Sequence, residues 1–472
     1  MNIFKEIRKA VRKLFRKNNI EAAFGVNIAV STKMEEAMQL WTEMFEDHPP
    51  WKDEGKGKKT LNLPASIASE LARLVTVEMK SEVTGSPRAE YINAQYQPVI
   101  SRIRPISEYA IAMGGIVLKP YVSGDRIFVT TVQAVDFYPT AFDSDGNVTG
   151  GVFTDYSYKG NYKYTRLEEH KLEGGAYLIR NKVYRLTINE VTATNDNALG
   201  NEVPLTEVDE WAEIQPEVTI NGMERTLFSY YRMPFANNIE PRSPLGVSGF
   251  SKAKDLIKEA DRQYSEILWE YEAGESAIHA SSNLFKKDKD GKTILPQGRE
   301  RQYRTFDFDR DQKIEPYNPT FRDGSLFNGL NEYLQRIEFM CGLAYGTLSK
   351  PTQVDKTATE VKQSKQRSFT TVCDIQKALQ TALENLIYAI DALATLYDLA
   401  PEGTYEVSFE FDDSIIVDRE VEFSRLMSMA SADMIRPEKV VAWYFGVSEE
   451  EALKMLPQAQ PPEPEILPED EE

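Results

Sequence analysis

The sequence offers one group of residues spaced for metal chemistry, the alternating carboxylates Asp307, Asp309 and Asp311. On a β-strand, side chains two positions apart point to the same side, so these carboxylates would share one face and supply the oxygen ligands that Mg²⁺ prefers. A metal-dependent nuclease is therefore one hypothesis. The simpler interpretation, which we prefer, is the exposed face of a small sheet that turns Phe306 and Phe308 inward, because no Glu-x-Lys or His motif accompanies the carboxylates.

Other patterns with chemical meaning point away from catalysis. The run DSDGN at 143–147 starts like a calcium loop, but the glutamate required at the twelfth position is missing, so we expect a hairpin turn. The phosphate-binding motif GxxxxGK[ST] and the nucleophile motif GxSxG do not occur. Three scattered histidines and two cysteines, Cys341 and Cys373, have no metal-ligand spacing. We predict that the chain is not an enzyme and holds no metal or cofactor.

Composition and charge narrow the classes of protein. With 472 residues and 41% hydrophobic content, the chain can bury sizeable cores in about three domains or subdomains. A net charge of -19 argues against a protein that coats DNA, since cationic side chains supply most non-specific affinity, but it allows DNA to pass through a channel. The low cysteine content argues against a disulfide framework and favours an intracellular protein. No apolar run approaches the roughly eighteen residues of a membrane span.

Residues 3–113 of the sequence predict helices. Residues 3–17 form a basic amphipathic pattern, for which a surface helix docked on its own or a neighbouring subunit is preferred over membrane-surface binding. A helix over 32–45, capped by Ser31 or Thr32, a helix over 62–78 and a helix over 90–113 follow. The last of these ends at Gly114-Gly115.

The middle of the sequence changes to a period of two, which predicts strands. A hairpin is expected around 123–125, with further strands in 147–170, 176–188 and 227–233. About ten tyrosines in this region could stack on bases, but tyrosine alternating with charge is also the ordinary face of a half-exposed sheet, which is preferred.

Two helices flank a small β module in the following region. The first runs from Gly246 to Gly274, and the second runs over 326–346. The β module between them contains a hairpin signal at Asp290-Gly291.

A helix of about forty residues, roughly 60 Å long, begins after residue 356. Its polar start carries Lys362, Lys365 and Arg367 and should project into solvent or an aqueous cavity. Its apolar residues recur at steps of three and four, as one face of a helix requires: Val372, Ile375, Leu379, Leu383, Leu386, Ile390, Leu393 and Tyr397. We expect this apolar face to be larger than one subunit can cover, so that neighbouring subunits cover the rest. A strand over 404–416 and helices over 421–429, 436–443 and 448–456 follow, before a Pro-rich, acidic tail expected to be disordered.

The order of these elements, with several short motifs, resembles portal proteins of tailed double-stranded DNA bacteriophages, most of all the branch from siphophages of Gram-positive hosts. The resemblance covers nearly the whole chain. It rests on the order of five motifs: PLGVS at 244–248, LAYG at 343–346, TATEV at 357–361, MIRPE at 434–438 and EEEA at 449–452.

The resemblance implies an α+β fold with the parts that this family has. They would be an N-terminal wing over 1–243, stem helices over 244–274 and 325–345, a β-rich clip over 275–324, a tunnel loop over 346–356, a long wing helix and strand over 357–414, a helical crown over 415–456 and the acidic tail over 457–472.

The resemblance also implies the function of a portal. A ring, expected to hold twelve subunits, would sit at one capsid vertex of the virion after assembly in the bacterial cytoplasm. Double-stranded DNA would pass through it during packaging and ejection. The partners would be the large terminase subunit, the major capsid and scaffolding proteins and a head-completion adaptor, with no membrane involved. Another virion structural protein, such as a minor capsid or baseplate component, is the alternative.

Two sets of residues would then meet partners. The tunnel loop consists of Gly346, Thr347, Leu348, Ser349, Lys350, Pro351, Thr352, Gln353, Val354, Asp355 and Lys356. Its lysines, together with Lys362 and Lys365, would touch phosphates transiently. The part of the clip that would dock the terminase and later the adaptor consists of Lys286, Lys287, Asp288, Lys289, Asp290, Gly291 and Lys292.

Overall fold

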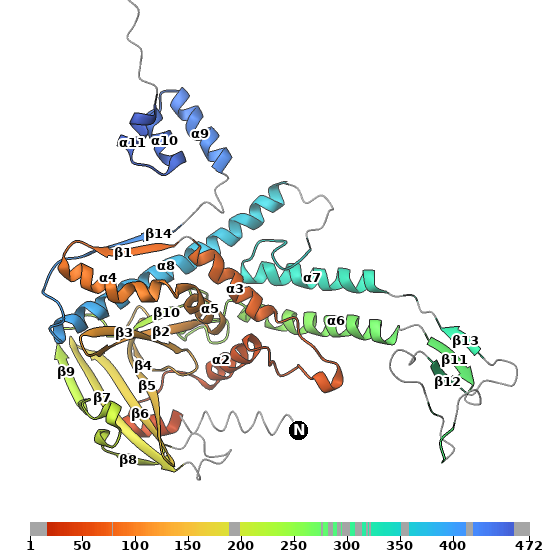
Figure 1. Cartoon of the computed structure of the whole chain (residues 1–472), viewed down its shortest axis with the longest axis horizontal. Helices are drawn as coiled ribbons and strands as arrows, with labels where there is room; N and C mark the ends of the chain where they lie inside the picture. Colours follow the sequence, from red (N-terminus) through yellow and green to blue (C-terminus); the bar gives the residue numbers. More distant parts are fainter. Residues whose placement is uncertain are drawn as a thin grey trace, which may run out of the picture. The chain divides into compact units, whose positions relative to one another are not determined.

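The computed structural model contains helices and sheets in the order shown in Figure 1, which confirms the α+β fold class. It describes residues 17–77, 79–187, 199–274, 277–281, 287–289, 294, 303–306, 314–317, 320, 322–350, 358–411 and 419–456. The chain divides into two compact units, residues 1–411 and residues 412–472. The expected basic helix over 3–17 lies almost entirely outside the described residues, which begin with a helical segment at 17–24.

The first two expected helices are present. Helix α2 (Thr32–Phe45) begins after Ser31, whose side chain accepts a hydrogen bond from the backbone N–H of Met34. Helix α3 (Leu63–Thr76) buries one face, on which Ile67 and Leu71 are completely inaccessible to solvent. Both helices therefore pack into the main core.

The helical stretch predicted over 90–113 is present, but it is divided into two helices. Helix α4 (Pro87–Ile100) and helix α5 (Ile103–Met113) are separated at residues 101–102. Pro105 explains the break: proline cannot donate to the carbonyl four residues earlier, but it is tolerated in the first turn of a new helix. Helix α5 ends at Gly114, whose φ is +85°.

The strands between residues 115 and 232 form two antiparallel sheets, as the period of two predicted. The smaller has the order β10-β2-β3 and contains the expected hairpin. Its strands are β2 (Gly115–Ser123), β3 (Arg126–Gln133) and β10 (Ser229–Arg232). The larger has the order β4-β5-β6-β7-β8, with β9 also paired to β7. Its strands are β4 (Tyr138–Phe142), β5 (Val148–Lys159), β6 (Tyr162–Glu173), β7 (Ala176–Thr187), β8 (Asn201–Val203) and β9 (Glu217–Asn221). Residues 143–147 turn between β4 and β5, which confirms the predicted hairpin turn.

For each of the next two helices, one predicted boundary was wrong: the start of the first helix and the end of the second. Helix α6 (Lys254–Ala273) begins eight residues after Gly246, because the backbone at 246 packs against another backbone segment. A Cβ on residue 246 would lie only 2.0 Å from the carbonyl oxygen of Gly114. Helix α7 (Asp323–Cys341) ends before Gly342, whose φ of +72° turns the chain out of the helix four residues before Gly346.

Helices α6 and α7 run antiparallel. The side-chain amide of Gln263 donates to the carbonyl of Leu326 (3.4 Å), and the guanidinium of Arg322 pairs with the carboxylate of Glu270 (2.8 Å). Between them in sequence, β11 (Ala277–Ser281) pairs in parallel with β12 (Tyr303–Phe306) and antiparallel with β13 (Ile314–Tyr317). The predicted turn at Asp290-Gly291 and the carboxylates at 307, 309 and 311 lie outside the described residues.

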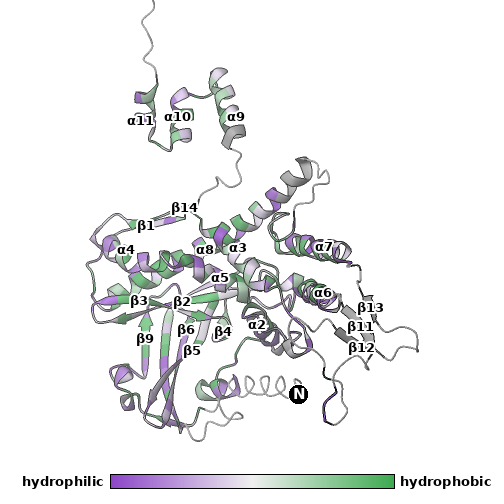
Figure 2. Ribbon diagram, turned by 45° about the vertical axis from the view of Figure 1, so that its right-hand side comes forward, coloured by the Kyte–Doolittle hydropathy of each residue, from purple (hydrophilic) through white to green (hydrophobic). Residues whose placement is uncertain are grey.

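The long helix is confirmed as α8 (Ala358–Leu396), 39 residues in length, and hydrophobic and hydrophilic residues alternate along it in Figure 2. Its apolar stripe is buried within a single chain, which corrects the expectation that other subunits must cover it. Leu383 and Leu386 are fully buried, and the hydroxyl of Ser229 on β10 donates to the carbonyl of Ala382 (2.6 Å). Tyr397 lies beyond the helix end and is 60% exposed, so it does not extend the stripe.

The remaining described elements are a pair of strands in the first unit and three helices in the second. Strand β1 (Lys80–Thr84) pairs antiparallel with β14 (Glu406–Glu410). In the second unit, the expected helices are α9 (Arg419–Ser431), α10 (Pro437–Phe445) and α11 (Glu449–Met455). The side chains of Val440 and Ala452 are buried in this unit. The acidic tail, 457–472, lies outside the described residues.

Candidate nucleic-acid interface

Residues 346–350, the described part of the predicted loop, follow α7 and precede α8. Leu343 is fully buried just before the loop, while Lys350 at its other end is exposed. Gly346 has a φ of +88°, a value that glycine adopts without strain. The remaining loop residues, 351–356, lie outside the described residues.

The side chain of Glu338 on α7 holds the first half of the loop. Its carboxylate is fully buried and accepts hydrogen bonds from the backbone N–H groups of Leu348 (2.5 Å), Ser349 (2.8 Å) and Gly346 (3.3 Å). The hydroxyl of Ser349 donates to the same carboxylate (2.9 Å). All four donors come from the loop itself, and none is a charged side chain.

Aromatic and cationic side chains join the end of α7 to α8. The guanidinium of Arg367 on α8 lies 4.2 Å from the ring centre of Phe339 and 5.6 Å from that of Tyr345. Gly342 lies against Thr371 so closely that a Cβ at 342 would be 2.3 Å from its hydroxyl. These contacts connect the two helices on either side of the loop.

The described lysine side chains at this site, Lys350 and Lys365, face solvent. The backbone N–H of Lys350 donates to the side-chain oxygen of Asn331 (2.7 Å), and its ammonium lies 5.8 Å from the ring centre of Phe327. Lys365 on α8 is also exposed. Exposed ammonium groups can pair with phosphate oxygens, an interaction that carries no base specificity. Lys356 lies outside the described residues, and the side chain of Lys362 is not described.

Within the second predicted set, Lys287, Asp288 and Lys289 are exposed. The other members, Lys286, Asp290, Gly291 and Lys292, lie outside the described residues. The structure thus brings the first half of the loop together with α7, and it does not relate the loop to the second set.

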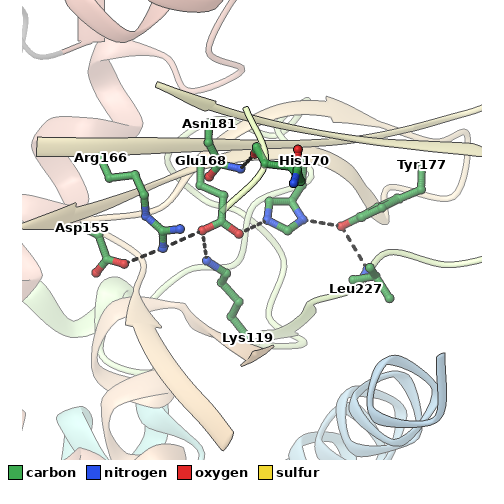
Figure 3. Close-up of polar contacts among 9 residues, drawn as sticks. Lys119, Asp155, Arg166, Glu168, His170, Tyr177, Asn181 and Leu227 are labelled. Carbon is green, nitrogen blue, oxygen red and sulfur yellow. Dashed lines mark hydrogen bonds and ion pairs between the residues drawn. The ribbon is translucent and has the colours of Figure 1, made fainter. Parts of the chain in front are cut away.

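A buried polar network in the sheets was not predicted (Figure 3). The carboxylate of Glu168 on β6 pairs with the ammonium of Lys119 on β2 (2.5 Å), with Arg166 (3.1 Å) and with the imidazole of His170 (2.6 Å). The other ring nitrogen of His170 contacts the hydroxyl of Tyr177 on β7 (2.7 Å). The Arg-x-Glu-x-His spacing, which places all three on one face of a strand, was the available signal.

Burial and charge set the protonation of this network. Burial pushes the pKa of Glu168 upward, but Lys119, His170 and Arg166 outweigh it, so the pKa lies well below its usual value. Burial lowers the pKa of His170, so the imidazole is neutral near neutral pH. The network borders a cavity of about 480 Å³ that Thr130, Asp136 and Tyr156 also line. The ion pair between Lys119 on β2 and Glu168 on β6 joins the two sheets.

The described parts of the chain show no group of three or more His, Cys, Asp or Glu side chains that could hold a metal ion. Among the same residues, no helix is long and apolar enough to cross a membrane. Within the described residues, the predicted loop presents one exposed lysine, Lys350, on a segment anchored to α7.

Comparison with known proteins gives a family match. The model of the family described as "Phage portal protein, SPP1 Gp6-like" matches residues 96–461. No curated protein matches the chain. Among solved structures, a chain from the neck of a native GTA particle computed with C12 symmetry shares 11% sequence identity, with 82% of this chain and 90% of that chain covered and a TM-score of 0.35. That likeness is too slight to assign a role to any residue.

Proposed function

This chain belongs to the SPP1 Gp6-like family of phage portal proteins, and on that premise we propose how it works as a portal. Copies of the chain form a closed ring of twelve at one vertex of the capsid. Double-stranded DNA enters and leaves the head through the central channel. The carrying observation is the family match over 96–461, which runs from α4 through the helices of the second unit and includes the loop.

Exposed apolar side chains on α6 and α7 support self-association. Trp269 on α6 is 63% exposed, and Phe339 and Met340 on α7 are 55% and 45% exposed. Phe339 and Met340 are consecutive, and exposed large apolar side chains that lie together mark contact sites on protein surfaces. In a ring, each subunit presents one face to its neighbour on one side and a different face to its neighbour on the other, and an antiparallel helix pair offers both.

Charge supports a passive conduit. A chain with a net charge of -19 repels the DNA backbone, so a ring of such chains lets a duplex slide without being trapped. The loop over 346–356 lines the narrowest part of the channel. Its lysines, with Lys362 and Lys365, are local exceptions that touch phosphates transiently.

The ring has no catalytic role of its own in this proposal. A separate large terminase subunit hydrolyses ATP and docks on the clip, where Lys287 and Lys289 are exposed. The head-completion adaptor later binds the same end, and the major capsid and scaffolding proteins surround the ring during assembly in the host cytoplasm. The portal is a component of the virion.

The experiment that tests the channel role changes the loop charges. We expect Lys350→Glu combined with Lys356→Glu to leave ring assembly and melting temperature nearly unchanged, because exposed single charges contribute little to stability. The amount of DNA packaged or retained should change, since the variant repels phosphate where the wild type attracts it. Lys258→Glu, at an exposed position on α6, is the matched control.

Two results would overturn this proposal. Loss of ring assembly in the loop variant would make the loop a contact between subunits. Unaltered DNA content at low salt, where electrostatic contact is strongest, would mean that the loop does not touch DNA.

A further inference from the structure

Residues 346–350 run back along α7. Gly346, Leu348 and Ser349 bond to Glu338, near the end of the helix, whereas Lys350 bonds to Asn331, two helical turns earlier. Because positions seven residues apart lie on the same helix face, these two side chains form a single stripe. The loop therefore starts by retracing the helix that precedes it.

Glu338 and the loop depend on each other. A carboxylate without solvent or a partner is strongly destabilised in a protein interior. Here the loop replaces water with three backbone N–H groups and the Ser349 hydroxyl, and hydrogen bonds to a charged acceptor are stronger than neutral ones. The conformation of residues 346–349 thus depends on the presence and charge of one α7 side chain.

Asn331 and Phe327 on α7 contact Lys350, the last residue of the docked segment 346–350. The side-chain oxygen of Asn331 accepts the backbone N–H of Lys350, and Phe327, one turn earlier on the helix, lies beneath its ammonium. These contacts determine where on α7 the exposed charge of Lys350 is presented.

We propose that Glu338 and Asn331 are positioning residues of the channel loop. They dock residues 346–350 on α7 and fix the position at which the Lys350 ammonium is offered to passing phosphates. The inference rests on the proposed function for its meaning, since only in a channel does the position of this charge matter. The docking itself is independent of DNA and can be tested without it.

The test is amide hydrogen exchange on the assembled full-length protein with Glu338→Gln. The substitution keeps the size of the side chain but removes its charge and places an amide N–H₂ group where donors converge. We expect exchange at the amides of Gly346, Leu348 and Ser349 to accelerate about tenfold or more, because each loses a charge-assisted partner. Exchange in α7 should stay slow. Glu332→Gln, at an exposed position on the same helix, should leave the loop amides as slow as in the wild type.

Asn331→Ala provides a second variant that leaves Glu338 intact. Removing its side-chain oxygen should accelerate exchange at the Lys350 amide while the amides of Gly346, Leu348 and Ser349 remain protected. Wild-type exchange at the loop amides in both Glu338→Gln and Asn331→Ala would overturn the inference.

DNA content separates this inference from the proposed function. Accelerated loop exchange together with altered DNA retention supports both. Accelerated exchange with wild-type DNA retention keeps the docking of the loop on α7 and contradicts a role of the loop in the channel. Unaltered exchange overturns the positioning role whatever the DNA content.

Discussion

The carboxylates of Glu168 and Glu338 have different kinds of partners. Glu168 is surrounded by cationic and neutral nitrogen groups from Lys119, Arg166 and His170, whereas Glu338 is surrounded by loop N–H groups. The ion pair with Lys119 joins β6 to β2, a strand of the other sheet. Backbone donors tie a segment that has no regular structure of its own, so the second arrangement fixes a loop.

The pH dependence of stability should report on His170. Its pKa is lowered by burial, so the unfolded chain takes up a proton near the usual value of 6.5 while the folded chain does so only at lower pH. The unfolded state therefore binds more protons below that value, and the free energy of unfolding falls as pH falls. The nearby charges of Lys119 and Arg166 also lower the pKa of His170, whereas Glu168 raises it. We expect the melting temperature to drop between about pH 7.5 and about pH 5.5.

His170→Gln should reduce the slope of melting temperature against pH over that range, because the group responsible is gone. It should also lower the melting temperature at neutral pH, since Glu168 and Tyr177 lose part of their hydrogen bonding. His48→Gln, at an exposed position, is the control and should keep the wild-type slope. Equal slopes in wild type and His170→Gln would contradict the assignment.

At the residue scale, sequence could identify the loop but not what holds it. Lys350 and Lys356 could be predicted as loop residues because Gly346 and Pro351 indicate a bend, and the charges beside them indicate that it is exposed. Glu338 was missed because a single glutamate in a helix is ordinarily a surface residue, and its burial depends on where a later loop folds back. That relation between distant positions has no periodic signature.

At the scale of elements, helix α8 was predictable and several boundaries were not. A stripe of apolar residues at steps of three and four fixes the existence of a 39-residue helix, whatever packs against it. The late start of α6 depends instead on a close approach between the backbones at Gly114 and Gly246. Such contacts are tertiary, so the local pattern at 246–253 still resembled a helix.

Gly246→Ala should destabilise the fold by about 1–3 kcal/mol, the usual cost of overpacking. Its Cβ would lie 2.0 Å from the Gly114 carbonyl oxygen and 3.0 Å from the backbone nitrogen of Met233, so backbone must move. Gly324→Ala is the matched control, because a Cβ there meets no atom within 4 Å and the substitution stiffens the unfolded chain. Thermal melting of both variants is the measurement, and equal melting temperatures would contradict the close approach.

Deleting residues 287–292 tests the docking role proposed for the clip. The described residues of this stretch, Lys287, Asp288 and Lys289, are exposed, so their loss should leave the fold and head assembly intact. Packaging should fail, because the terminase loses part of its contact. DNA content of assembled heads is the measurement, and wild-type packaging would place terminase docking elsewhere.

At the scale of the whole molecule, the structure changes which surfaces are available between subunits. Leu383 and Leu386 on α8 are covered within one chain, so charged substitutions there would act on folding first. Trp269 and Phe339 on α6 and α7 are exposed instead. The second unit also exposes large apolar side chains, Met434 at 72% and Leu453 at 60%. In the proposed ring, we expect contacts between copies to involve such exposed apolar side chains.

Electron microscopy of the purified full-length protein tests most directly whether this chain forms a DNA conduit. We expect closed rings of twelve subunits with a central hole about as wide as a DNA duplex, because a contact repeated between two different faces of identical subunits generates a ring when its rotation closes. Monomers, open filaments or closed particles without such a hole, at concentrations where the protein is folded, would contradict the proposal that this chain forms a DNA conduit.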